Sequence, residues 1–248
     1  MPNTSKAHYD NLLAEHYDWM FGATFEQKVA EQKALLRQVT GETPGGDFAV
    51  DLGCGSGFQS VALQELGYRV LALDDSEKLL GRLAARVDAR NVTTRLADIR
   101  NLDDYVAAAS ADVVVCMGDT LTHLTSRQEV CALFRSATRA LKPGGAFVVS
   151  YRDLAGSELR GLERFISVRG DDERVMTCFL EYHDPETVVV NDLVQIRRDD
   201  GQWALHKSSY QKLRLPIAWV REHLLAAGLV IVVSRTGPMV TLAAVKPR

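Results

Sequence analysis

A glycine-rich loop, Asp51-Leu52-Gly53-Cys54-Gly55-Ser56-Gly57, is the feature that most constrains the fold of this chain. It follows a short apolar run that predicts a buried strand and precedes a predicted helix, 58–66. Glycines let the backbone turn tightly and let a ligand approach without an intervening Cβ atom. A dinucleotide-binding loop, GxGxxG, would need glycine at position 58, where this chain has Phe58. The spacing therefore favours a ligand without phosphate; the alternative is a plain tight turn.

Short apolar strands alternate with helices from residue 48 to residue 151. This order is typical of a parallel sheet covered by helices on both faces. Ser76 is expected to cap one of the helices, and Pro143-Gly144-Gly145 to form a turn. We predict strands at 48–52, 69–73, 93–97, 112–117 and 146–151, helices at 77–89, 127–141 and 218–227, and a terminal hairpin of strands 229–234 and 240–245 linked through Gly237-Pro238.

A different pattern separates Tyr151 from the last helix. Four strand-like segments, 164–169, 173–182, 187–197 and 202–213, are joined by polar turns, which is typical of an antiparallel meander. The first 45 residues have helical periodicity that ends at the turn Thr43-Pro44-Gly45-Gly46. The chain is therefore expected to consist of a helical N-terminal lid (1–45), a core domain (46–152 and 216–248) and an inserted antiparallel cap (153–215).

Acidic residues follow the second and third predicted strands. Asp74 and Asp75 end the second, and Asp98 with Ile99 follows the third. A carboxylate about 20 residues after a glycine loop can accept hydrogen bonds from both hydroxyls of a ribose. A carboxylate at Asp98 can accept from an adenine amine, with the Ile99 N–H donating to the ring. The alternatives are that Asp74 and Asp75 merely cap the next helix and that Asp98 is an ordinary loop acid.

Together these residues resemble the class I S-adenosylmethionine (SAM) dependent methyltransferases over about residues 48–151. The matching motifs are the glycine loop, Asp74 with Ser76, Asp98, and Leu141-Lys142-Pro143-Gly144-Gly145. The resemblance implies a Rossmann-like, seven-stranded, mostly parallel α/β sheet with helices on both faces, plus the inserted antiparallel β cap. It implies SAM as cofactor and S-adenosylhomocysteine (SAH) as product. The cofactor-binding residues that it implies here are Asp51, Gly53, Cys54, Gly55, Gly57, Asp74, Asp75, Asp98 and Ile99.

Three segments resemble glycine N-methyltransferase and its relatives more narrowly: 116–124, 151–154 and 28–31. The resemblance implies that the carbonyls of Met117 and Gly118 face the SAM amine and the transferring methyl group. It places Lys28 at the SAM carboxylate, where the family has arginine, and Lys28 lacks the planar fork of that side chain. Asp119 stands where the family has asparagine, and a carboxylate there could attract a cationic amine or take its proton.

The expected acceptor site has several candidate residues. His123 is read as a polar contact or proton acceptor beside the methyl group, or as a histidine held for packing. Arg152 can grip a substrate carboxylate with two hydrogen bonds, or form an ion pair with Asp153 or Asp119. Tyr17 is a candidate to close the site together with Tyr9 and Trp19, the alternative being simple core packing, and Tyr210 lies near a family tyrosine in the last cap strand.

Composition narrows the class of partner. The chain has 248 residues, 25% of them charged, with a formal net charge of −3, a pI of about 6.1 and no basic stripe, so a nucleic-acid partner is not expected. Four scattered cysteines without metal spacing predict reduced thiols, a cytoplasmic location and no metal site. No apolar run is long enough for a membrane anchor, and no signal peptide is expected. A homo-oligomer is possible.

The predicted function is SAM-dependent methyl transfer to a small-molecule acceptor, with an amine nitrogen of an amino-acid-like substrate favoured. Two alternatives remain within the same fold: a small-molecule O-methyltransferase, and a protein that binds SAM without transferring its methyl group. A nicotinamide-dependent oxidoreductase is disfavoured by Phe58, and a DNA or protein methyltransferase is disfavoured because the fourth strand runs into Met117-Gly118-Asp119-Thr120 rather than an Asn/Asp-Pro-Pro-Tyr loop.

Overall fold

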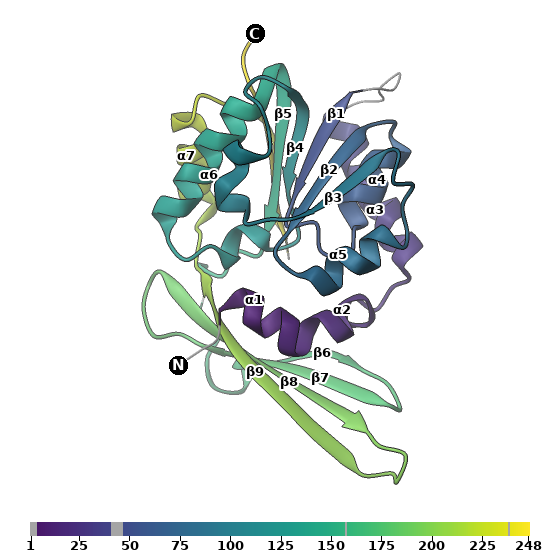
Figure 1. Cartoon of the computed structure of the whole chain (residues 1–248). Helices are drawn as coiled ribbons and strands as arrows, with labels where there is room; N and C mark the ends of the chain where they lie inside the picture. Colours follow the sequence, from purple (N-terminus) through teal and green to yellow (C-terminus); the bar gives the residue numbers. More distant parts are fainter. Residues whose placement is uncertain (1–3, 41–46, 157, 238) are drawn as a thin grey trace.

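Two β-sheets organise the computed structural model, which describes residues 4–40, 47–156, 158–237 and 239–248 (Figure 1). The main sheet has the strand order β10-β11-β5-β4-β1-β2-β3, and the smaller sheet has the order β6-β7-β8-β9. All neighbours in the main sheet are parallel except β11, which is antiparallel to both β5 and β10. The predicted Rossmann-like α/β fold with an inserted antiparallel sheet and a terminal hairpin is confirmed.

The strand and helix bounds follow the predicted alternation closely. The main sheet contains β1 (Phe48–Leu52), β2 (Arg69–Asp74), β3 (Val92–Leu96), β4 (Ala111–Cys116), β5 (Leu141–Tyr151), β10 (Val230–Arg235) and β11 (Val240–Val245). The cap sheet contains β6 (Phe165–Gly170), β7 (Arg174–Glu181), β8 (Thr187–Arg197) and β9 (Trp203–Leu213). The helices are α1 (Ser5–His8), α2 (Ala14–Met20), α3 (Phe25–Thr40), α4 (Phe58–Glu65), α5 (Glu77–Ala84), α6 (Arg127–Ala140) and α7 (Ile217–Ala226), and a π-helical turn, Tyr9–Leu13, joins α1 to α2.

Two local predictions about α5 are wrong. The helix ends at Ala84 rather than near residue 89, because the Asp88 carboxylate accepts the N–H of Arg90 and forms a turn that competes with the helix. Ser76 occupies the position before the helix, but its side chain does not cap it. The Ser76 hydroxyl instead donates to the carboxylate of Asp10, a residue of the N-terminal segment that the local pattern could not anticipate.

The predicted turn at residues 143–145 belongs to β5 instead. The N–H of Gly144 donates to the carbonyl of Lys246, and the N–H of Lys246 donates to the carbonyl of Gly145. This pairing draws the turn residues into the ladder, although Gly144 has a φ of +83° and the register with β4 shifts here. The predicted stop at Thr43–Gly46 lies outside the described residues, as does Pro238 of the predicted hairpin link.

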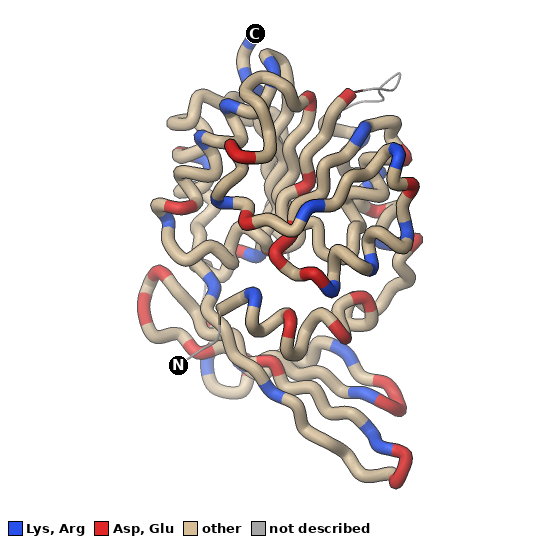
Figure 2. The backbone as a smooth tube through the Cα atoms, viewed as in Figure 1, with Lys and Arg blue, Asp and Glu red and all other residues tan. Residues whose placement is uncertain are grey.

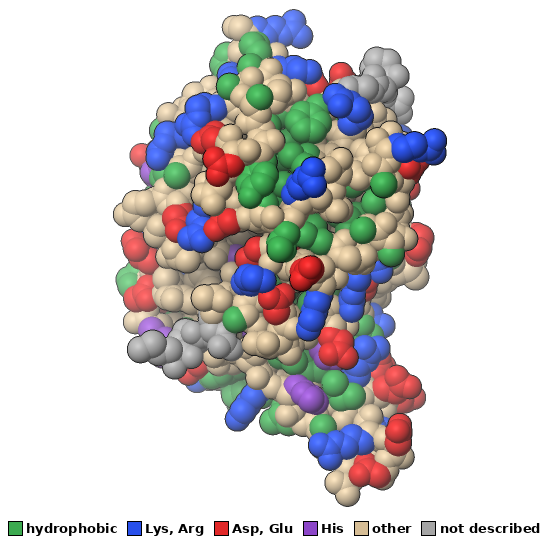
Figure 3. Space-filling view, in the orientation of Figure 1, with side chains coloured by type: hydrophobic (Ala, Val, Ile, Leu, Met, Phe, Trp, Pro, Cys, Tyr) green, Lys and Arg blue, Asp and Glu red, His purple; other side chains and the backbone are tan. Residues whose placement is uncertain are grey.

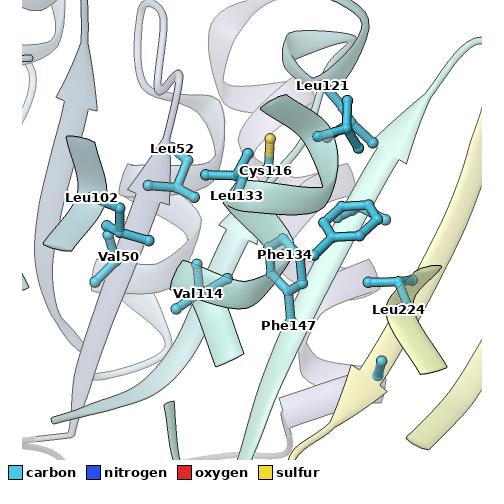
Figure 4. Packing of buried hydrophobic residues seen from close by; sticks show 14 of the residues in the cluster. Val50, Leu52, Leu102, Val114, Cys116, Leu121, Leu133, Phe134, Phe147 and Leu224 are labelled. Atoms are coloured by element: carbon cyan, nitrogen blue, oxygen red, sulfur yellow. The ribbon is translucent and has the colours of Figure 1, made fainter. Parts of the chain in front are cut away.

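The main sheet is packed with apolar side chains on both faces. Alternate strand residues point to opposite faces, so that Val50 and Leu52 face α6 and α7 while Ala49 faces α3, α4 and α5. Figure 4 shows Phe134 of α6 packed against Phe147 of β5 within the first of these clusters. This two-sided packing holds the carboxyl ends of β1, β2, β3 and β4 at one edge of the sheet.

The N-terminal helices lie between that edge and the cap sheet (Figure 1). On the cap side, Leu12 and Leu13 pack against Met176 and Val194. On the other side, the Lys6 ammonium donates to the carbonyl of Asp75 at 2.7 Å. The segment is therefore in contact with both sheets, and its designation as a lid, like the division into lid, core domain and cap, remains our proposal.

The surface carries charges of both signs. Figure 2 shows acidic positions gathered where β2 runs into α5, facing the N-terminal helices. On the face viewed in Figure 3, Lys and Arg side chains are interspersed with Asp and Glu side chains rather than gathered in a stripe. Among the described helices, none has the length and apolarity that a bilayer-crossing segment requires.

Candidate active site

A cavity of about 420 Å³ lies at the carboxyl edge of the main sheet, beneath the N-terminal segment. Its volume falls within the range of small-molecule sites. It brings together nine of the side chains and loop positions that the sequence predicts: Tyr17, Gly53, Gly55, Asp74, Asp75, Asp98, Ile99, Gly118 and His123. Eight others lie outside its lining: Lys28, Asp51, Cys54, Gly57, Met117, Asp119, Arg152 and Tyr210.

The glycine loop is tightened by backbone and side-chain contacts. The N–H groups of Gly53 and Cys54 both donate to the carbonyl of Leu73, at 2.8 and 3.0 Å. Gly53 has a φ of +70°, and a Cβ added there would lie 2.3 Å from Cγ2 of Thr120. The Thr120 hydroxyl donates to the carbonyls of Gly53, at 3.3 Å, and Met117, at 3.0 Å. Glycine at position 53 thus lets the loop close against the segment after β4.

Asp74 is held with both carboxylate oxygens at the cavity. Its Oδ2 accepts the N–H of Gly55 and its Oδ1 accepts the N–H of Ser76, each at 2.8 Å. Burial raises the pKa of Asp74 to about 6, against the lowering effect of these two hydrogen bonds. Each carboxylate oxygen keeps a lone pair, so the ionised group is oriented to accept further hydrogen bonds from a diol.

Cofactor binding is expected to weaken as the pH falls through about 6. Protonated Asp74 has lost acceptor capacity, so a ligand that needs the carboxylate must first displace the proton. The dissociation constant of SAH, measured by calorimetry, should rise roughly tenfold for each pH unit below about 6. The Asp74→Asn variant should bind SAH weakly and without this dependence. If the SAH dissociation constant depends on pH equally in the wild type and the variant, the assignment of this dependence to Asp74 is contradicted.

Asp98, at the other strand end, is fixed by a charged network. Arg100 donates from Nε to both oxygens of Asp98, at 3.0 and 2.8 Å, and from Nη1 to Glu129 at 2.9 Å. The Arg100 hydrogen bond lowers the pKa of Asp98 below its usual value. Ile99 and Leu124 add apolar surface to the cavity lining. The lining therefore combines a fixed acceptor with apolar side chains, the combination that an adenine ring needs.

Asp51 lies beneath the loop rather than in the lining. It is 1% exposed, and the hydroxyl of Ser60 donates to its Oδ2 at 2.6 Å. Burial raises the pKa of Asp51 to about 7, and the nearby charge of Asp74 adds to the effect. Cys54 and Gly57 also support the loop from outside the cavity, since Cys54 is buried and a Cβ on Gly57 would meet Leu83 at 2.3 Å.

Replacing Asp51 with asparagine should remove much of the loss of stability with rising pH. The native state holds a proton on Asp51 up to about pH 7, whereas the unfolded chain loses it near pH 4. The free energy of unfolding therefore falls as the pH rises through this window. The free energy of unfolding of the variant should match that of the wild type at pH 4 and exceed it at pH 8 by on the order of 4 kcal/mol, at about 1.4 kcal/mol per pKa unit. Denaturant titrations at both pH values test this. A difference between variant and wild type that is the same at pH 4 and pH 8 would contradict it.

The carboxylate of Asp119 is held by two cations and one backbone N–H. Its Oδ2 lies 2.8 Å from the Lys212 ammonium and 3.4 Å from Nε of Arg152, and its Oδ1 accepts the N–H of Arg152 at 2.7 Å. Burial by itself raises the pKa of Asp119, but the two cations outweigh it and lower the pKa to about 2. The side chain is 10% exposed and joins the core domain to β9 of the cap. An ion pair with a lysine 93 residues away therefore engages the carboxylate that was predicted to attract or deprotonate an amine, and that role stays a prediction.

His123 lines the cavity and lies among aromatic rings. Its ring centroid lies 5.4 Å from that of Tyr9 and 5.4 Å from that of Tyr210. Burial and, to a lesser degree, the charge of Lys212 together lower the pKa of His123 to about 3. Burial also raises the pKa of Tyr9 and Tyr17 well above their usual values. The rings therefore present neutral polar groups at neutral pH.

Lys28 and Arg152 are not brought to the cavity. The Lys28 ammonium pairs with Glu31 on its own helix at 2.7 Å, because both face the outer side of α3. The Arg152 side chain is 55% exposed and pairs with Asp119, which was the alternative considered for it. Tyr210 lies behind His123, and Met117 is 3% exposed beneath Thr120. Their predicted roles toward SAM and substrate remain hypotheses.

Sequence reasoning missed several residues of the site. Lys6 and Glu129 line the cavity, and Arg100 lines it as well. Thr120 could have been found, because it lies within the segment 116–124 that carries the narrower resemblance. Lys212 had no local signal, since its partner Asp119 is 93 residues away. Among the described residues, no group of three or more His, Cys, Asp or Glu side chains is placed to hold a metal ion.

Known proteins match the region that forms this cavity. Residues 49–145 match a family model described as a methyltransferase domain. The cypemycin N-terminal methyltransferase of a Streptomyces species is 32% identical over 154 residues, which are 62% of this chain and 60% of the relative. Mouse glycine N-methyltransferase is 30% identical over 160 residues, which are 58% of this chain and 53% of the relative. The chain thus spans little more than half the length of these two relatives.

Solved structures share the whole fold. The SAM-bound structure of CalS10, an amino pentose methyltransferase from Micromonospora echinaspora, aligns with a TM-score of 0.74 at 16% identity, covering 94% of this chain and 95% of that one. Because the alignment covers 94% of this chain, it includes both sheets. The cavity described above is lined by the glycine loop and by the acids at the strand ends. Residues 49–145 therefore resemble a methyltransferase domain, the chain has the fold of SAM-dependent methyltransferases, and these similarities support SAM as the cofactor.

Proposed function

We propose that this protein transfers the methyl group of SAM to an amine nitrogen of a small molecule. The observation that carries the proposal is one cavity lined by two unlike groups of side chains. Asp74 and Asp98 provide fixed acceptors, and the neutral His123 lies among tyrosine rings. The acids fit an adenosyl group, and the part of the cavity around His123, which we call the acceptor end, would take the acceptor beside the segment after β4.

The charge of the lining favours ligands with positive charge. Four carboxylates, Asp74, Asp75, Asp98 and Glu129, line the cavity, against two cations, Lys6 and Arg100. SAM supplies a methyl group on a positively charged sulfur that leaves readily. An anionic acceptor would be repelled by this excess of carboxylates, whereas an amine would not. The acceptor is therefore expected to be an amine rather than a carboxylic acid.

The protein side of the reaction consists of positioning and exclusion of water. Holding two reactants in line can contribute about 7–11 kcal/mol to lowering a barrier. The N-terminal segment covers the cavity through Lys6, Tyr9 and Tyr17. Among the described residues around His123, neither candidate base is strong, because Asp119 is held in its ion pairs and His123 has a pKa of about 3. The amine must therefore shed its proton to water and attack in its uncharged form.

The names of the relatives point in the same direction. One acts as an N-terminal methyltransferase, one as a glycine N-methyltransferase, and the fold neighbour is an amino pentose methyltransferase. An amino-acid-like acceptor would use the guanidinium of Arg152 for its carboxylate, which requires Arg152 to turn away from Asp119. A small-molecule partner is proposed in either case, and a homo-oligomer remains a prediction.

Purified protein incubated with methyl-labelled SAM and a panel of acceptors tests the proposal. The panel contains amino acids, a peptide with a free N-terminus, an amino sugar, a phenol and a carboxylic acid. We expect label in the amines, SAH as coproduct and a rate that rises with pH toward the pKa of the amine. Label in the phenol alone would establish the O-methyltransferase alternative. SAH binding without turnover on any acceptor would leave a SAM-binding protein.

A further inference from the structure

A buried histidine–carboxylate pair connects the N-terminal segment to the cap. Nε2 of His8 lies 2.9 Å from Oδ2 of Asp192 on β8. The exposed fractions are 0% for His8 and 3% for Asp192. The distance is that of a hydrogen bond between the imidazole and the carboxyl group. Neither residue lines the cofactor cavity, and the proposed reaction does not use the pair directly.

His8 is joined to both tyrosines that flank His123. Tyr9 is its neighbour in the chain and begins the π-helical turn, which directs successive side chains differently from an α-helix. Tyr210 stacks on the His8 ring, with centroids 4.0 Å apart and planes at 25°. Since the Tyr9 and Tyr210 rings each lie 5.4 Å from His123, the three rings at the acceptor end depend on where His8 is held.

Packing alone does not explain this pair. Replacing a buried polar pair by apolar side chains of similar volume is often neutral or stabilising. His8 also leaves Nδ1 buried without a hydrogen-bond partner among the described residues, which is a cost rather than a gain. The hydrogen bond to Asp192 fixes the rotation of the His8 imidazole ring. It thereby also fixes the orientation of the Tyr210 ring that stacks on it.

We propose that His8, oriented by Asp192, is a positioning residue for the acceptor end of the active site. It acts through Tyr9 and Tyr210 and sets the width of the space beside His123 that an amine would occupy. The inference rests on the proposed function for its effect on turnover. Its effect on the N-terminal segment is independent of which acceptor is used.

The decisive variant is the apolar double replacement His8→Phe/Asp192→Leu, which keeps the stacked ring and the buried volume. We expect thermal stability and the SAH dissociation constant to stay near wild type, while kcat falls on the order of 10²-fold, as expected for a small misplacement of reacting groups. Asp192→Asn keeps an oxygen acceptor for Nε2 and should retain most of the activity. His206→Phe, on an exposed position of β9, is the matched control and should change nothing.

Two readouts separate this inference from the proposed function. Hydrogen exchange of residues 4–20 should be faster in the double variant and unchanged in β1 and β4, whatever the acceptor. If the wild-type protein methylates no amine, the proposed function is refuted, but the exchange measurement still tests the positioning role of His8. Wild-type kcat in the double variant, unchanged exchange in residues 4–20, or a loss of SAH affinity that matches the loss of kcat would each overturn the positioning role.

Discussion

Replacing Lys212 with methionine is expected to lower the free energy of unfolding by about 3–5 kcal/mol, the usual result of removing one partner of a buried ion pair. The Lys212 ammonium lies 2.8 Å from Asp119, and each side chain is 10% exposed. Without it, Asp119 keeps only the more exposed Arg152 as a cationic partner. Denaturant unfolding of the variant and the wild type at pH 7 measures the difference.

Two companion variants isolate the cause. Lys207→Met, on an exposed position of the same strand, should leave stability unchanged. Lys212→Met/Asp119→Asn should recover most of the loss, because asparagine removes the charge, tolerates the φ of +81° at this position and still accepts the N–H of Arg152. A loss in Lys207→Met as large as in Lys212→Met would show that the buried pair is not the cause.

The same pair has a predicted pH dependence. Burial raises the pKa of Asp119, and the cations reverse this and lower it to about 2. A carboxyl with a lowered folded-state pKa stabilises the fold above its unfolded pKa and loses that contribution as the pH falls toward the folded value. The difference between wild type and Lys212→Met/Asp119→Asn should therefore shrink between pH 4 and pH 2.

The second large effect is expected for Gly53→Ala, which should disrupt the glycine loop and cofactor binding together. The left-handed φ of +70° costs an L-residue about 1–2 kcal/mol. The added Cβ would also lie 2.3 Å from Cγ2 and 2.6 Å from Oγ1 of Thr120, and overpacking of this kind costs roughly 1–3 kcal/mol more. Thermal unfolding and SAH calorimetry measure the two consequences.

Gly118→Ala is the matched control for backbone strain. Gly118 has nearly the same φ, +72°, but an added Cβ there meets no atom within 4 Å, so its unfolding free energy should show the strain alone. Removing the Thr120 side chain in Gly53→Ala/Thr120→Ala should restore part of the stability, after correction for the single Thr120→Ala variant. If Gly53→Ala is no less stable than Gly118→Ala, the contact with Thr120 does not constrain the loop.

The sequence by itself determined the fold class and brought the glycine loop and the strand-end acids to one cavity. Apolar strand runs, the loop of residues 51–57 and acids at positions 74 and 98 are local signals, and the carboxyl ends of parallel strands necessarily meet at one edge. Each of these residues is placed by its own strand and turn. That is why Gly53, Gly55, Asp74 and Asp98 lie in one cavity, as the pattern predicts.

Tertiary structure alone decided the contacts of Asp119 and His8. Asp119 pairs with a lysine 93 residues away, and His8 pairs with a carboxylate 184 residues away, both on the inserted sheet. The docking of that sheet, which no local pattern encodes, decides which charges become buried partners. It makes Asp119 a junction between core and cap, where two cations offset the cost of burying the carboxylate, and the catalytic role predicted for Asp119 stays a prediction.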